Sequence, residues 1–232
     1  MSFFTRRKIL ALALAAPLCE GAFWLYNEWN QPWYKALAWS PDGSGVVCDY
    51  GHADGFDGAV VIVPKNGGRE IVLHDNPGGS EPCRAALFSP DGRKVAFEHF
   101  GLYVTDADGK NVRKLGSYLG LGWSSDGEWL AVEDEGRKFE IHTRTDEKRK
   151  FAGKTPPKND SSREEYSPQR LPNGDFVIPR WNTNDRGQIW LVNGKTLRGN
   201  ELVRGSYPLV SPQGDTLAYT DERGWLRFLA LD

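Results

Sequence analysis

Five copies of one turn motif follow one another along this chain, at an interval that few folds can accommodate. Each copy joins a strand-like segment to a tight turn ending in glycine, and the first two read Ser-Pro-Asp-Gly. The five copies are Trp39–Gly43, Phe88–Gly92, Trp123–Gly127, Arg170–Gly174 and Val210–Gly214. Their glycines are 35 to 49 residues apart. A period of roughly 40 residues with several short strands per unit is typical of propeller blades. The repeat therefore predicts a β-propeller of about five blades.

The residues around each turn predict short strands. Proline presets φ, Asp or Asn tolerates the bend and Gly accepts positive φ, so the chain reverses between two strands. The segments after the turns are apolar or aromatic: 45–48, 94–97, 129–132, 176–178 and 216–219. After residue 30 no long apolar period of 3.6 residues occurs. We expect an all-β propeller over residues 34–232 with four-stranded blades, except that the chain stops after the third strand of the fifth.

The second blade is the cleanest unit, and it carries a family resemblance. It runs from Phe88 through the turn at Gly92 and a second glycine turn at Gly109 to Leu115. This unit resembles the WD40-like repeat of TolB-type β-propellers, which occur in bacterial envelope proteins and in propeller domains of some peptidases. The resemblance covers residues 36–232. It implies the blade type; TolB proteins carry an additional N-terminal domain, for which we expect no room here.

The N-terminal segment predicts export. A basic stretch, Thr5–Lys8, precedes the apolar run Ile9–Leu18, as in a signal peptide, and the arginine pair resembles a loose twin-arginine signal. Residues 1–22 are thus a signal peptide or an uncleaved N-terminal membrane anchor helix, and 23–33 are a linker or a ring-closing strand. Either version places the propeller in the periplasm, free or anchored to the inner membrane.

Charge limits the partners. The chain holds 29 Lys and Arg against 31 Asp and Glu, a net charge of −2. No basic stripe interleaved with stacking aromatics stands out, so we expect no nucleic-acid partner, and membrane contact only through the N-terminal segment.

Export makes a disulfide possible. Cys48 lies on the second strand of the first blade, and Cys83 precedes the inner strand of the second. In an oxidising compartment the two could pair. The alternative is two buried thiols too far apart to bond.

One face of the predicted ring is the default binding surface. If the Pro-Asp-Gly turns lie on a lower face, the loops between second and third strands lie on an upper face. Two groups of aromatic, cationic and amide residues fall in or beside these loops: Arg180, Trp181, Asn182, Asn184 and Arg186, and Arg223 with Trp225. Exposed Trp beside Arg is typical of interface hot spots. The alternative is that each Trp packs between blades.

Aligned inner strands suggest an anion site. Lys35 and Arg84 both stand four residues before the blade aromatic, and Tyr34 and Tyr118 both stand five before it. Such a group could accept a carboxylate or phosphate, although each cation could equally pair with a local acid.

A metal site is a further possibility at the upper loops. His52, Asp54 and His99 fall there, but their spacing matches no ligand motif, and solvated loop residues are the alternative. No other cofactor is indicated.

Catalytic signals are absent from the sequence. The predicted inner strands 35–39, 84–88, 119–123, 166–170 and 206–210 carry no Asp or Glu, and no Gly-x-Ser-x-Gly elbow occurs. We therefore expect a non-catalytic protein-binding or scaffold module of the bacterial cell envelope, with an envelope protein as partner. The alternative is a carbohydrate-active or metal-dependent hydrolase using the upper face.

Overall fold

The computed structural model describes residues 32–231 except 53–56, 78–81, 152–167 and 182–186. A compact unit begins at Pro32 and extends to the end of the chain. Every regular element in the described part is a β-strand. The predicted linker or ring-closing strand before residue 32 and the N-terminal signal or anchor helix lie outside the described residues.

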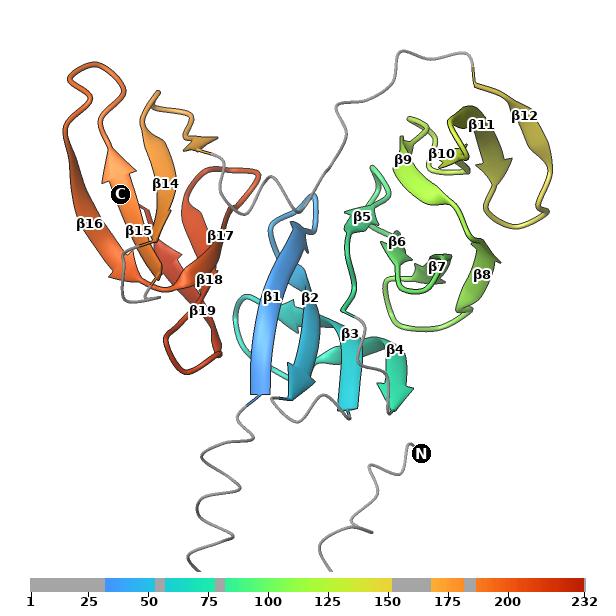
Figure 1. The fold of residues 1–232 in the computed structure, drawn as a ribbon, viewed down its shortest axis with the longest axis horizontal. Helices are drawn as coiled ribbons and strands as arrows, with labels where there is room; N and C mark the ends of the chain where they lie inside the picture. Colours follow the sequence, from blue (N-terminus) through green and yellow to red (C-terminus); the bar gives the residue numbers. More distant parts are fainter. Residues whose placement is uncertain (1–31, 53–56, 78–81, 152–167, 182–186, 232) are drawn as a thin grey trace, which may run out of the picture. The chain divides into compact units, whose positions relative to one another are not determined.

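The strands form five antiparallel sheets, here called blades 1 to 5 (Figure 1). Blade 1 contains β1 (Pro32–Trp39), β2 (Gly45–His52), β3 (Asp57–Pro64) and β4 (Ile71–Pro77). Blade 2 contains β5 (Ala86–Phe88), β6 (Lys94–Glu98), β7 (Leu102–Asp106) and β8 (Arg113–Gly116). Blade 3 contains β9 (Leu119–Trp123), β10 (Trp129–Asp134), β11 (Arg137–His142) and β12 (Lys148–Lys150). Blade 4 contains β13 (Gln169–Arg170), β14 (Phe176–Trp181), β15 (Gly187–Val192) and β16 (Gly199–Arg204). Blade 5 contains β17 (Ser206–Val210), β18 (Thr216–Thr220) and β19 (Leu226–Ala230).

Each blade is a simple meander in which consecutive strands pair antiparallel. The prediction of an all-β propeller of five blades is thereby confirmed. Over the described residues blade 5 has three strands, as the repeat predicted. The first strand begins at Pro32, two residues ahead of the expected boundary.

Hydrogen bonds explain why the turn motif repeats. In blade 1 the Asp42 carboxylate accepts hydrogen bonds from the Ser40 hydroxyl at 2.6 Å and from the Ser44 backbone N–H at 3.0 Å. These bonds hold the pKa of Asp42 below its usual value. Gly43 closes the turn with φ of 71°, a conformation that glycine adopts without a steric penalty. The same serine–aspartate bond recurs in blades 2 and 3, at 2.7 and 2.5 Å.

The hydrophobic core lies between the blades. One cluster joins blade 1 to blade 2, and a second joins blade 2 to blade 3. Two others join blade 1 to blade 5 and blade 5 to blade 4. The first and last blades are also tied by the Trp39 indole N–H, which donates to the Leu209 carbonyl at 2.9 Å, and by the Thr220 hydroxyl, which donates to the Tyr34 carbonyl.

The two predicted disulfide partners are separate buried thiols in the structure. Cys48 packs in the cluster between blades 1 and 5, with Ala218 of blade 5. Cys83 packs in the cluster between blades 1 and 2, with Val47. Because successive side chains of a strand point to opposite faces, Cys48 and its neighbour Val47 face different blades. The predicted pairing of Cys48 with Cys83 is therefore not formed, and burial raises the pKa of both thiols.

Candidate functional site

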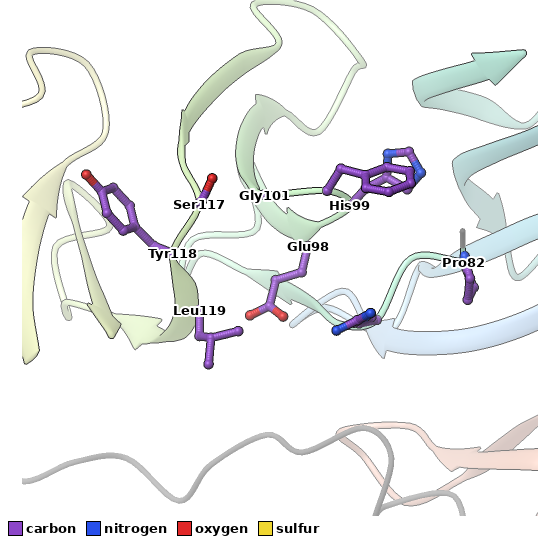
Figure 2. Close-up of a pocket in the computed structure, with 9 residues that line it drawn as sticks. Pro82, Glu98, His99, Gly101, Ser117, Tyr118 and Leu119 are labelled. Atoms are coloured by element: carbon purple, nitrogen blue, oxygen red, sulfur yellow. The ribbon is translucent and has the colours of Figure 1, made fainter. Parts of the chain in front are cut away.

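A cavity of about 280 Å³ opens where blade 2 meets blade 3. We call it the seam pocket. Its walls come from the segment before β5, the β6–β7 turn, and the β8–β9 connection with the start of β9 (Figure 2). The lining residues are Pro82, Arg84, Glu98, His99, Phe100, Gly101, Ser117, Tyr118 and Leu119.

The β6–β7 turn presents an aromatic ring at the edge of this pocket. Phe100 has φ of 46° and is 64% exposed. A bulky residue in the left-handed region is strained, and such strain persists only where the surroundings enforce it. Here the His99 backbone N–H donates to the Gly101 carbonyl at 2.8 Å, and the Lys114 ammonium donates to the Phe100 carbonyl at 3.0 Å. The hairpin thus holds the ring out in solvent against its local preference.

Blade 3 contains the same turn with a different side chain. Glu135 stands eight residues after its turn glycine, as Phe100 does, and also has φ of 46°. Neither residue suits this conformation, so the backbone is set by the hairpin rather than by the side chain. The blade 2 turn is distinguished by what it displays: an apolar ring instead of a carboxylate.

Glu98 anchors the wall of the pocket to blade 3. Its Oε1 accepts the Gly120 backbone N–H at 2.7 Å. Figure 2 shows the Glu98 side chain leaving the end of β6 toward Leu119. The bond fixes the start of β9, and with it the side chain of Leu119, which is 43% exposed.

Two ammonium groups lie beside the seam pocket. Lys148 donates to the Tyr118 hydroxyl at 2.9 Å, and this bond raises the pKa of Lys148. Its Nζ also lies 5.2 Å from the centre of the Tyr118 ring, a cation–π contact. Lys114 lies at the β6–β7 turn, where its ammonium donates to the Phe100 carbonyl. Both lysines are exposed.

The structure divides the predicted anion site. Arg84 and Tyr118 both line the seam pocket. Tyr34 is buried in the cluster between blades 1 and 5, and its hydroxyl donates to Glu70 at 2.7 Å. Lys35 lies over the Tyr207 ring at 5.5 Å. The prediction placed all four in one anion site; Arg84 and Tyr118 share the seam pocket, and Tyr34 and Lys35 do not line it.

The predicted metal ligands are only partly described. His99 lines the pocket, is buried, and its ring lies 5.3 Å from that of His74. Burial, and then the charge of His99, lowers the pKa of His74. His52 ends β2, and Asp54 lies outside the described residues. Within the described ranges no three His, Cys, Asp or Glu side chains gather into a possible metal site.

The predicted partner-binding residues fall at two places. Arg180 lies over the Trp190 ring at 4.7 Å, and Trp181 ends β14. The stretch with Asn182, Asn184 and Arg186 lies outside the described residues. In the β18–β19 turn Arg223 is exposed, and Trp225 is 38% exposed with its ring 6.1 Å from Tyr34. Trp225 therefore packs against blade 1 and is also partly exposed, so it has features of both alternatives: a Trp between blades and an exposed interface residue.

Sequence analysis missed Phe100, Leu119 and the carboxylates of the second strands. Asp49, Glu98 and Glu133 each stand six residues after the turn glycine of their blade. That spacing is visible in the sequence, on the second strands rather than the inner ones. The structure shows that Glu98 bonds to the next blade, and that Asp49 does so as well: it accepts the Cys83 backbone N–H.

Comparison with known proteins gives likeness of fold only. No family model and no curated protein matches the chain. Solved structures similar to it include TolB from Acinetobacter baumannii, at 16% identity and a TM-score of 0.38 over 85% of this chain and 51% of that one. Another is oligogalacturonate lyase from Vibrio parahaemolyticus, at 11% identity and a TM-score of 0.49 over 86% and 89%. The chain thus spans about half the length of the TolB structure, and at these values the likeness concerns the blades alone.

A membrane-spanning element is not found among the described residues: none of them forms a helix long and apolar enough to cross a bilayer.

Proposed function

We propose that this chain is an exported β-propeller that binds a protein partner in the bacterial cell envelope, and that the seam pocket with its Phe100 turn is the contact surface. The observation that carries the proposal is Phe100 itself: a phenyl ring held in solvent by a backbone conformation that its own side chain disfavours. Blade 3 has the same backbone at Glu135, so the blade 2 turn is marked by the exposed ring and not by the strain.

The surroundings of Phe100 support a protein contact. Leu119 adds a second exposed apolar group from a different blade. The same lining also contains charged and hydroxyl-bearing side chains, so apolar and polar groups lie together at this pocket. Aromatic anchors beside a partly desolvated pocket dominate the energetics of protein interfaces. The signal-like N-terminal segment and the TolB-type blade repeat support the envelope location.

A hydrolase acting on the same face is the competing function. Glycoside hydrolysis generally requires two carboxyl groups that flank the scissile bond. Among the residues lining the seam pocket, Glu98 supplies a carboxylate and the others do not. The binding role fits this composition better.

The test is a comparison of three full-length tagged proteins in affinity capture from envelope extract: wild type, Phe100→Asn and Glu135→Asn. We expect a protein to be retained in stoichiometric amount by wild type and by Glu135→Asn, and to fall about tenfold or more with Phe100→Asn, the loss expected of a hot spot. Equal retention by all three variants, or no retained protein, would contradict the proposal.

The Phe100 variant also carries its own control for folding. Asn tolerates the left-handed conformation better than Phe, so Phe100→Asn should raise the free energy of unfolding by about 0.5–1 kcal/mol. Glu135→Asn places Asn in the same backbone conformation in blade 3 and should raise the free energy of unfolding by a similar amount. Urea unfolding followed by fluorescence measures both, and a loss of capture in the more stable protein is then a loss of contact.

A further inference from the structure

We propose that Asn66 is a site of spontaneous covalent modification, at which the backbone nitrogen of Gly67 attacks the side-chain amide and water completes the conversion to aspartate or isoaspartate. The site lies in the β3–β4 turn of blade 1. The inference goes beyond the proposed function and does not depend on it.

The reaction uses the Asn-Gly sequence itself. The Gly67 nitrogen forms a bond to Asn66 Cγ, the Cγ–Nδ2 bond breaks, and Nδ2 leaves as ammonia with the proton that the Gly67 nitrogen has lost. The product is a five-membered succinimide ring. Water then adds to one of its two carbonyl carbons and opens the ring, which gives aspartate or isoaspartate according to the bond that breaks. Glycine favours ring closure because it has no Cβ to obstruct the approach of its nitrogen.

The chain contains three Asn-Gly pairs, and all three are in turns between strands. They begin at Asn66, Asn173 and Asn193, and each of these asparagines is exposed. Sequence and exposure therefore give the three sites similar reactivity. Hydrogen bonding separates them.

The pair at Asn193 is held at both reacting groups. The Asn193 Oδ1 accepts the backbone N–H groups of Lys195 and Thr196, at 3.1 and 2.9 Å. Its Nδ2 donates to Asp175 at 3.2 Å, and the Gly194 N–H donates to the same carboxylate at 2.9 Å. The attacking nitrogen and the side-chain amide are thus bound to other groups, and the reaction requires these bonds to open first.

The pair at Asn173 is held in a similar way. The Asn173 Oδ1 accepts the Asp175 N–H at 2.9 Å, and its Nδ2 donates to the Asp175 carboxylate at 3.2 Å. The Gly174 N–H donates to the Leu171 carbonyl at 2.9 Å. The turn motif of blade 4 therefore protects its own asparagine.

The pair at Asn66 lacks this protection. Within the described ranges the Asn66 side chain forms no hydrogen bond, and the Gly67 N–H donates to the Pro64 carbonyl at 3.2 Å. Gly67 and Gly68 both have positive φ, and a Cβ built on either would meet no atom within 4 Å. Nothing in the described chain packs against this turn, so little opposes the rotation that brings the Gly67 nitrogen to the Asn66 amide.

The modification would change the charge at the boundary of blades 1 and 5. The Lys65 ammonium lies 3.7 Å from Asp215 Oδ1 of blade 5. A carboxylate at position 66 gives Lys65 a second acid to pair with, and in an exposed ion pair this has a small effect on stability. The Lys65 N–H donates to the Ser44 carbonyl, so the site lies beside the first turn motif, at the strand ends opposite to those that carry the Phe100 turn.

The test follows the three sites within one protein. The full-length chain is kept in mildly alkaline heavy-oxygen water, and its peptides are analysed over time by mass spectrometry with chromatographic separation of aspartate and isoaspartate. We expect Asn66 to be converted at least about tenfold faster than Asn173 or Asn193, since several hydrogen bonds must open at those two sites. Both products should appear at position 66, with heavy oxygen in the new carboxyl group.

Unfolded protein and two variants assign the difference to the fold. In concentrated urea the three rates should come within about twofold of one another, because the protecting bonds are gone. Asp175→Ala removes the acceptor of the Gly194 N–H, so it should speed conversion at Asn193 by about fivefold or more and leave Asn66 unchanged. Asn66→Gln keeps an amide but requires a six-membered ring, and it should abolish the fast conversion.

Three results would overturn the inference: equal rates at the three sites in folded protein, a ranking that persists unchanged in urea, or a product at position 66 without isoaspartate. The second result would assign the difference to neighbouring sequence and not to the hydrogen bonds. The third would mean that no succinimide forms.

Discussion

The contact between blades 1 and 2 and the contact between blades 2 and 3 (the two seams) each contain a carboxylate at the same position of the repeat. The first contact is packed closed, and the second opens into a pocket. Asp49 and Glu98 both stand six residues after a turn glycine, and both accept a backbone N–H from the next blade. Around Asp49 the seam is closed: the residue is 5% exposed, and Cys83, whose N–H it accepts, is fully buried. Around Glu98 the seam opens into the pocket.

The difference shows what a repeat leaves undecided. The spacing puts a carboxylate toward the end of the second strand in blades 1, 2 and 3. The side chains of the next blade decide whether the space around it is filled. Cys83 fills the first seam, while Ser117 and Leu119 leave the second one open. One oxygen of Asp49, Oδ2, has no hydrogen-bond partner, so the closed seam buries a polar atom at a cost.

The largest expected effect is on stability, and it compares the packed contact between blades 1 and 2 with the open contact between blades 2 and 3. Phe97 is fully buried in the cluster between blades 1 and 2, where its ring stacks on Tyr103 at 5.3 Å. Phe97→Ala should lower the free energy of unfolding by about 3–5 kcal/mol, since it opens a cavity in a packed core. Leu119→Ala at the pocket rim should cost about 1 kcal/mol or less. Urea unfolding of both variants measures this, and similar losses would remove the distinction between a closed and an open seam.

The second expected effect is a pH dependence of stability caused by the buried carboxyl of Asp49. Burial raises the pKa of Asp49 to about 7, although the Cys83 N–H and the charge of Lys35 act to lower it. The unfolded carboxyl titrates near pH 3.9, so between about pH 4 and pH 7 the folded state holds a proton that the unfolded state has lost. The stability that Asp49 gives the fold is therefore greatest below about pH 4 and is lost as pH rises to about 7.

Asp49→Asn should remove this dependence. The amide keeps an oxygen for the Cys83 N–H without a charge, so the variant should gain on wild type by about 3 kcal/mol between about pH 5 and pH 8. Thermal unfolding across that range measures the gap. A constant difference between the two proteins would show that Asp49 titrates normally.

The smallest expected effect lies at Glu98. Glu98→Ala removes the acceptor of the Gly120 N–H and should cost about 1–2 kcal/mol, whereas Glu98→Gln keeps an oxygen there and should cost about 0.5 kcal/mol or less. Urea unfolding of both variants measures this, and equal losses for the two would show that the bond to the Gly120 N–H contributes nothing to stability.

Much of the fold was predictable because it follows from local chemistry. Ser40, Asp42 and Gly43 form a turn through bonds made among themselves, so five copies of that pattern located five blades. Arg84 and Lys35 both stand four residues before the aromatic residue of their blade, yet their surroundings differ. Lys35 meets the Tyr207 ring of blade 5 and Arg84 lines a pocket, because the neighbouring blades are not identical.

The sequence by itself determined the blades, their number and the loops available for binding, since each turn is stabilised by residues two to five positions apart. Only the tertiary structure decided which carboxylate is buried, which cysteine faces which blade, and where a pocket remains. Those outcomes depend on side chains that meet across a seam from segments 20 to 40 residues apart, such as Glu98 with Gly120 and Asp49 with Cys83. Contacts of that range are fixed by packing between blades, and the period of the repeat says nothing about them.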